Sequence, residues 1–135
     1  MRAFLLFVAL LIGVSAPARA ADDVAAAQKV IRSQVEAFSR DDAAAAYSHA
    51  APAIQEMLPQ AEMFMAMVRG SYAPVYRHRS FEFGEARAAG GKIAQRVRIV
   101  DAEGLPWEAL YTLERQPDGS LKISGCTLLK AGQSV

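Results

Sequence analysis

The chain has 135 residues, and its 15 Lys and Arg against 14 Asp and Glu give a formal net charge of +1. This balance argues against a nucleic-acid-binding protein, which needs a basic surface, and against electrostatic docking on anionic membranes. The single cysteine, Cys126, excludes an internal disulfide, so packing must stabilise the fold.

The first twenty residues have the pattern of a secretory signal peptide. The basic start Met1–Arg2 precedes an apolar run over Ala3–Val14, and Ala18–Ala20 supplies the small residues needed for cleavage. The run is about a dozen residues long, whereas a membrane-spanning helix needs about 20, so we expect no stable membrane anchor. We predict cleavage after Ala20, one domain over 21–135 with a net charge of −1, and a periplasmic or secreted location.

The first half of the domain has helical periodicity. Asp22 and Asp23 are predicted to begin a helix, because carboxylates favour its positive end. Apolar residues then recur every three or four positions and form one helical stripe: Val24, Ala27, Ile31, Val35 and Phe38.

Three shorter helices are predicted next. Asp41 or Asp42 caps a segment from Ala43 to about His49, and Pro52 suits the first turn of a segment that reaches Leu58. A fourth segment begins at Pro59 and ends at Gly70, and Pro74 confirms the stop.

Beyond Pro74 the pattern changes to alternation of two, which is typical of strands. Four strands are expected, separated by turns at 89–91, 102–104 and 116–119: Ser80–Ala88, Lys92–Asp101, Trp107–Glu114 and Leu121–Thr127. Helices followed by an antiparallel meander predict an α+β fold, in which the helices cover the apolar face of the sheet.

Several segments resemble known families. Val30–Phe38, Asp41–Asp42 and Ala45–Tyr47 resemble the first helices of the nuclear transport factor 2-like superfold, a cone of helices on a curved sheet. A closer resemblance is to a bacterial family catalogued as domain of unknown function 4864. It rests on segments across most of the domain: Ile31–Phe38, Phe64–Val68, Tyr72–Arg77, Ala109–Thr112, Arg115–Ser120 and Ile123–Cys126.

The superfold resemblance implies a cavity between the helices and the concave face of the sheet. Its members include isomerases, dehydratases, polyketide cyclases and binding modules, so the fold alone does not choose a function. The clustered methionines and aromatic residues would either line such a cavity or pack as ordinary core. The polar and aromatic residues that follow, at the junction of helices and sheet, would form either the rim of the cavity or a solvent-exposed connecting segment. The candidate ligand-binding residues are Met63, Phe64, Met67, Tyr72, Tyr76, Arg77, Trp107 and Tyr111.

The sequence contains no strong catalytic or metal-binding motif. His49 and His78, with Cys126 far along the chain, lack metal-ligand spacing, and no nucleophile has a positioned base. Glu108 and Glu114 are expected on the exposed strand face. We therefore expect no catalytic residue, no metal and no cofactor. Cys126 is expected to be a buried structural residue.

The preferred hypothesis is a non-enzymatic exported module that binds a small apolar or amphipathic ligand. One alternative is a small lyase or isomerase, with a base among His49, Asp101, Glu108 and Glu114 beside Tyr47 or Tyr111. Another is a homodimer through the open face of the sheet, which is expected to carry Arg96, Arg98, Leu110 and Leu128.

Overall fold

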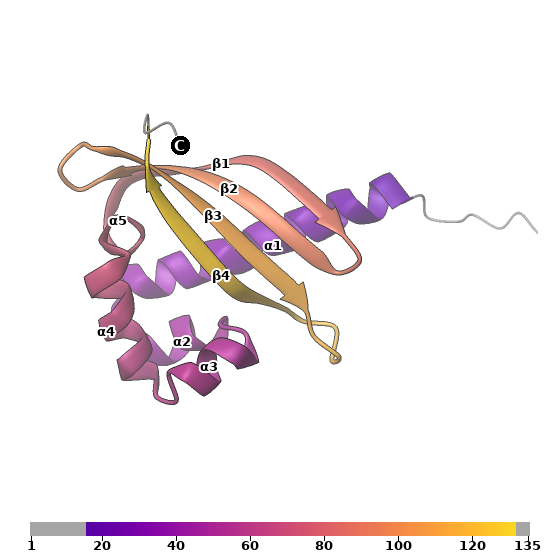
Figure 1. Cartoon of the computed structure of the whole chain (residues 1–135), viewed down its shortest axis with the longest axis horizontal. Helices are drawn as coiled ribbons and strands as arrows, with labels where there is room; N and C mark the ends of the chain where they lie inside the picture. Colours follow the sequence, from indigo (N-terminus) through magenta and orange to yellow (C-terminus); the bar gives the residue numbers. More distant parts are fainter. Residues whose placement is uncertain (1–15, 132–135) are drawn as a thin grey trace, which may run out of the picture.

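The computed structural model describes residues 16–131 and shows helices packed against one antiparallel sheet, which confirms the predicted α+β class (Figure 1). The strands are joined by hairpins and lie in the order β1-β2-β3-β4. The elements are α1 (Ala16–Ser39), α2 (Ala43–Ser48), α3 (Pro52–Met57), α4 (Ala61–Ser71), α5 (Ala73–Tyr76), β1 (His78–Ala89), β2 (Lys92–Asp101), β3 (Pro106–Arg115) and β4 (Leu121–Lys130).

Helix α1 already includes Ala16, the first residue that the structure describes, so the prediction that it starts at Asp22 was wrong. Ala16–Ala21 consists mainly of alanine, the strongest helix former. The predicted cleavage position after Ala20 therefore lies within the helix, and the apolar run of the signal pattern lies outside the described residues. Within residues 16–131, none of the helices is both long and apolar enough to cross a membrane.

The end of α4 also differs from expectation. The helix begins at Ala61, two residues after Pro59, and it continues through Gly70 to Ser71. Gly70 does not adopt the positive φ of a glycine that ends a helix, so the helix passes through it. Pro74 lies in the first turn of α5, a short helix that the sequence did not predict.

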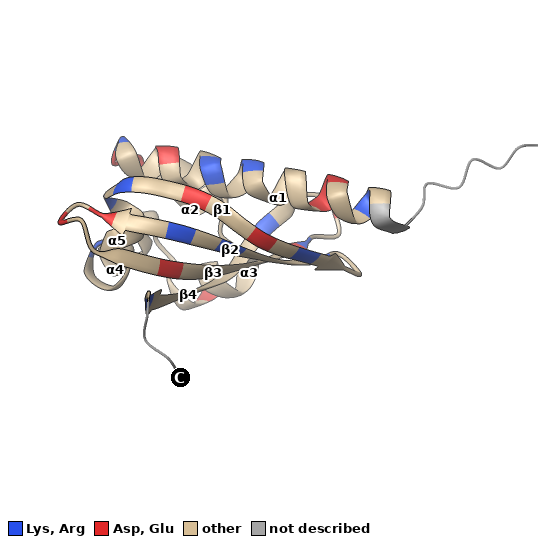
Figure 2. Ribbon diagram, turned by 90° about the horizontal axis from the view of Figure 1, so that it is seen from above, with Lys and Arg blue, Asp and Glu red and all other residues tan. Residues whose placement is uncertain are grey.

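The inner face of the sheet forms the core with the helices. Along β2, Ile93, Gln95, Val97 and Ile99 are buried, and the residues between them are half-buried or exposed. This alternation is the predicted one, and it places the apolar face toward α1. On α1 the stripe residues Ala27 and Ile31 are fully buried. Its charged residues lie mainly on the side away from the sheet (Figure 2).

A β-bulge changes which residues of β4 face the helices. Ile123 pairs with Leu113 but Gly125 pairs with Thr112, so β4 has one extra residue there. Beyond the bulge, Cys126 pairs with the buried Tyr111. Leu128 pairs with the buried Ala109 and packs against the core, so its predicted place on the open face was wrong. Its neighbour Leu129 is the exposed one.

The half of the sheet beneath α1 is closed by packing and by hydrogen bonds. The Gln28 side-chain amide donates to Gln95 Oε1 at 3.0 Å. The fully buried Gln95 in turn donates to the carbonyl of Gly84, at 3.0 Å, where β1 has its own register shift. Near the start of the helix, Arg115 reaches Asp23 at 2.6 Å. These contacts fix α1 across the sheet.

The other half is covered by short helices that stand on the β4 side (Figure 1). The segment before α3 pairs with β4: the amide of Ala51 donates to the carbonyl of Ile123, and the amide of Ile123 donates to the carbonyl of His49, both at 2.8 Å. Tyr47 Oη donates to the carbonyl of Leu58, which ties α3 to α2. Helix α3 itself has no buried residue, so it covers this half loosely.

Candidate ligand-binding cavity

A cavity of about 460 Å³ lies between α3, α4 and the inner face of β3 and β4. This volume falls within the range of about 300–1,000 Å³ that is usual for small-molecule sites. Its walls are Gln34, Phe38, Ala50, Ala53, Ile54, Met57, Leu58, Phe64, Met67, Val68, Tyr72, Val75, Tyr111, Ile123, Ser124, Gly125 and Cys126.

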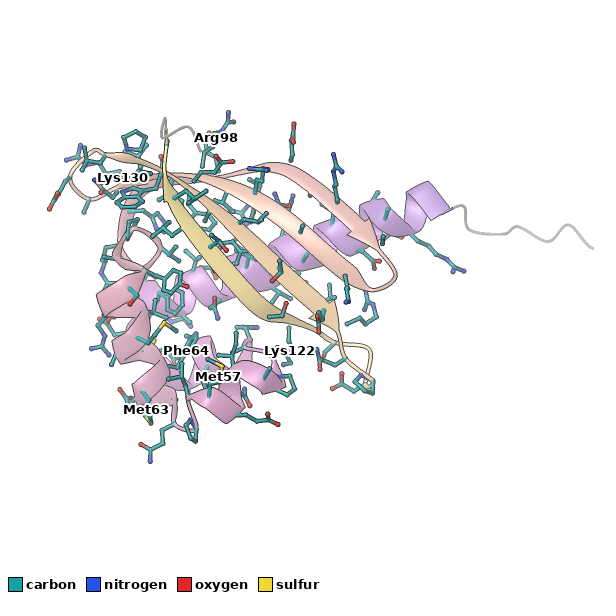
Figure 3. The ribbon with its side chains drawn as sticks, viewed as in Figure 1. Met57, Met63, Phe64, Arg98, Lys122 and Lys130 are labelled. Atoms are coloured by element: carbon teal, nitrogen blue, oxygen red, sulfur yellow. The ribbon has the colours of Figure 1, made fainter. Side chains whose placement is uncertain are left out.

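Two helical faces form the side of the cavity opposite the sheet. On α4, Phe64 and Val68 are buried, and Met67 lies beside them because positions three and four apart share a helical face. On α3, Ile54 and Met57 are related in the same way. Met57 is 77% exposed, which places it at the mouth, and Figure 3 shows it on α3 close to Phe64.

Aromatic packing holds α4 at its distance from the sheet. The ring of Phe64 lies 6.2 Å from Phe38 of α1 and 5.7 Å from Tyr47 of α2, measured between ring centroids. Phe38 in turn lies 5.8 Å from Tyr76. These tilted pairs support one end of α4, whereas α3 beside it lacks comparable burial. The cavity is the space that this arrangement leaves.

A few polar groups interrupt the apolar wall. The side-chain amide of Gln34 donates to the carbonyl of Ala46 at 3.1 Å, and Tyr72 Oη donates to the carbonyl of Cys126 at 2.9 Å. The hydroxyl of Tyr111 is different, because it is buried beside the weakly polar Cys126 thiol and has no hydrogen-bond partner of good geometry among the described residues. It is the one side-chain group of this kind in the described part of the chain.

The ionisable groups of the wall stay neutral near pH 7. Burial raises the pKa of the Cys126 thiol to about 12. Burial, and then the nearby Cys126, raise the pKa of Tyr72. Burial also raises the pKa of Tyr111 well above its usual value, and the adjacent Cys126 side chain and then Tyr72 add to this effect. Among the described residues, the wall contains no Asp, Glu, His, Lys or Arg. The cavity therefore offers hydrogen bonds but no charge.

The cavity wall includes four of the predicted ligand-binding residues: Phe64, Met67, Tyr72 and Tyr111. Met63 lies outside it, 45% exposed, near the end of α4 that is farther from the sheet (Figure 3). Trp107 is half-buried at the β2–β3 hairpin, where its indole N–H donates to Asp101 Oδ2 at 2.9 Å. Neither residue contributes to the cavity.

Tyr76 and Arg77 also lie outside the cavity and join the α1–α2 turn to the start of β1. The buried Tyr76 donates through its hydroxyl to Asp41 Oδ1. Arg77 reaches the same carboxylate at 3.0 Å and donates to the carbonyl of Phe38 at 2.8 Å. Its guanidinium lies 4.2 Å from the centre of the Tyr76 ring. Tyr76 and Arg77 therefore have a structural role.

The sequence did not single out Ile54, Leu58 or Cys126 as wall residues. Ile54 lies three residues before Met57 and four before Leu58, so extending the methionine argument to the preceding helix would have found both. Cys126 was expected to be a buried structural residue, and it is half-buried, with its side of β4 set by the bulge. No periodicity in the sequence marks that bulge.

The residues named for a lyase or isomerase lie elsewhere. Asp101 accepts hydrogen bonds from Trp107 and from the backbone amides of the β2–β3 turn, which lower its pKa. Glu108 pairs with Arg96 at 2.8 Å on the outer face. Burial, and then Lys122, lower the pKa of His49. Neither these residues nor Glu114 line the cavity in the part of the chain that the structure describes.

The described chain offers no better site elsewhere. A depression of about 510 Å³ lies at the β1–β2 hairpin end, but its charged residues Arg87, Lys92 and Glu114 are all exposed. Over residues 16–131, His, Cys, Asp and Glu do not gather in any group of three or more that would hold a metal ion. The cavity beside α3 and α4 is therefore the better enclosed candidate site.

Comparison with known proteins gives one match. Residues 20–134 match a family model described as "Domain of unknown function (DUF4864)". No curated protein and no solved structure matches the chain significantly.

Proposed function

We propose that this chain, which belongs to the DUF4864 family, is a binding module that holds a small apolar or amphipathic molecule in the cavity between α3, α4 and the sheet. The observation that carries the proposal is a cavity of about 460 Å³ with an almost wholly apolar wall. Burial of apolar ligand surface there would be favourable by about 25 cal/mol per Å².

The character of the wall supports binding rather than acid-base chemistry. Met57 and Met67 are flexible and polarizable side chains, which adapt their shape to different apolar ligands. An isomerase or lyase needs a positioned base within hydrogen-bond reach of its substrate. The carboxylates and the imidazole suggested for that role are not part of the cavity wall.

The wider fold and the location are parts of the same proposal. The order of helices and curved sheet, with a cavity between them, supports membership of the nuclear transport factor 2-like superfold. Export is supported by the signal pattern of residues 1–20 and by a family match that begins at residue 20. Cleavage after Ala20 would leave the packed part of α1 intact, since Ala18 to Asp22 are exposed or half-buried.

The binding proposal can be tested with Nile red, an uncharged dye that fluoresces in apolar surroundings. Ala53 is an exposed residue of α3 at the cavity wall, so Ala53→Trp should fill the mouth without disturbing the core. Ala66 is an exposed residue of α4 outside the wall, so Ala66→Trp is the matched control. We expect saturable binding to the wild type and to Ala66→Trp, and at least tenfold weaker binding to Ala53→Trp. Equal binding by both variants would contradict the proposal.

The location has a separate test. N-terminal sequencing of the protein recovered from each cell fraction should find Ala21 as the first residue in the exported fraction. Recovery of the protein only with its first twenty residues attached, in the cytosol or membrane, would contradict export.

A further inference from the structure

We infer that the ligand of this cavity is uncharged and carries an oxygen that accepts a hydrogen bond from Tyr111 Oη, as an ester, ketone, aldehyde or alcohol on an apolar chain would. The inference rests on the proposed function, because it concerns the ligand of the same cavity. It adds the chemical class of the ligand and the residue that recognises its polar end.

The hydroxyl of Tyr111 is buried, and no group among the described residues is placed to form a geometrically sound hydrogen bond with it. The side chain next to it is the Cys126 thiol, which is only a weak hydrogen-bonding group. Buried polar groups in proteins are nearly always hydrogen-bonded, and each exception calls for an explanation. The other polar side chains of the wall do have partners, since Gln34 donates to Ala46 and Tyr72 donates to Cys126. An oxygen of a bound ligand would supply the missing partner.

Tyr111 is placed at the wall of the cavity by its strand. Tyr111 and Cys126 are direct cross-strand partners on β3 and β4, and both line the cavity. Tyr72 also lines the cavity, and its hydroxyl donates to the carbonyl of Cys126. Tyr111 therefore lies on the cavity side of the sheet, with the Cys126 side chain beside its hydroxyl. Rotation of the Cys126 thiol about its single side-chain bond is the smallest movement that would open the hydroxyl to a ligand.

The described wall of the cavity carries no charge. None of the described wall residues is acidic or basic, so an ionised ligand group would be buried without a partner, which is strongly unfavourable. Tyr111 itself keeps its proton, because burial raises its pKa well above the usual value. The hydroxyl is thus a hydrogen-bond donor throughout the physiological pH range, and it fits a neutral acceptor.

The test is displacement of Nile red by four ligands of equal chain length: methyl laurate, dodecanol, laurate and dodecane, each below its solubility limit. The wild type should bind methyl laurate and dodecanol about threefold to tenfold more tightly than dodecane, which is the effect of one neutral hydrogen bond. Laurate at pH 8 should bind more weakly than methyl laurate.

Two conservative variants then assign the preference to one hydroxyl. Tyr111→Phe should lose the preference for the ester and the alcohol over dodecane. Tyr76→Phe is the matched control, because it removes a buried hydroxyl outside the cavity that already has a partner, and it should keep the preference.

The outcomes distinguish failure of the inference about Tyr111 from failure of the binding proposal. If the wild type binds no Nile red, or if Ala53→Trp binds it fully, the cavity is not a binding site and both proposals fail. If Nile red binding is blocked by Ala53→Trp but the ester and dodecane bind equally, only the inference about Tyr111 fails. An unchanged preference in Tyr111→Phe, or laurate binding as tight as methyl laurate, would also overturn it.

Discussion

The half of the sheet beneath α1 and the half that faces α3 and α4 are covered in different ways. Beneath α1, Ala27 and Ile31 are fully buried against the sheet, and the buried Gln95 is fully hydrogen-bonded. Beside β4, α3 buries no residue, and the nearby Tyr111 hydroxyl has no partner of good geometry among the described residues. The difference shows that the first half is packed more tightly than the second, which contains the proposed binding site.

The largest expected effect separates two isoleucines. Ile31→Ala, in the closed half, should lower the free energy of unfolding by about 2–5 kcal/mol, because it leaves a void in a packed core. Ile54→Ala, at the half-buried cavity wall, should cost about 1 kcal/mol. Urea unfolding measures both. Equal losses would mean that the two halves are equally packed.

The reactivity of Cys126 measures how well the half of the sheet that faces α3 and α4 is shielded from solvent. Because its pKa is raised to about 12, the thiol is almost entirely protonated at pH 8. Iodoacetamide should therefore modify it about a hundredfold more slowly than free cysteine, with a rate that rises with pH. Mass spectrometry of the labelled protein follows the reaction. Modification at the rate of free cysteine would show that the wall is solvated.

Gln95→Leu tests the polar network of the closed half. The substitution removes the donor to the Gly84 carbonyl and the acceptor for Gln28, so it should lower the free energy of unfolding by about 1–3 kcal/mol. Gln28→Ala removes one partly buried bond and should cost less. Chemical denaturation checks this order, and a neutral Gln95→Leu would show that the buried network is dispensable.

The smallest effect has the opposite sign. Tyr111→Phe should raise the free energy of unfolding by about 1 kcal/mol, because it removes a buried hydroxyl that has no partner of good geometry among the described residues. Tyr76→Phe is the matched control, since its hydroxyl is bonded to Asp41, and it should lower stability. Thermal unfolding of the two variants gives the signs. A loss of stability in Tyr111→Phe would imply that the hydroxyl has a structural role.

Periodicity predicted the fold class and the inner face of β2 because burial repeats along regular elements. It placed Phe64, Met67 and Tyr111 beside a cavity for the same reason, together with the resemblance to known folds. It misplaced the start of α1, because an alanine-rich segment continues a helix past the acidic residues that were taken as its beginning.

The remaining differences arise from irregular features. The bulge in β4 shifts the register by one residue, which places Cys126 and Leu128 on the inner face. Arg77 resembled a pocket-rim residue in the sequence, but Asp41, 36 positions earlier, is its partner in the fold. Pairings between distant segments depend on the tertiary structure, so local pattern could not reveal them.

The most direct test of the central claim is an amide NMR titration with methyl laurate. We predict shifts that cluster on both sides of the cavity, at residues such as Ile54, Val68 and Cys126, with Ala27 and Val97 of the closed half unchanged. Shifts confined to the outer face of the sheet, or none at saturating ligand, would contradict the account.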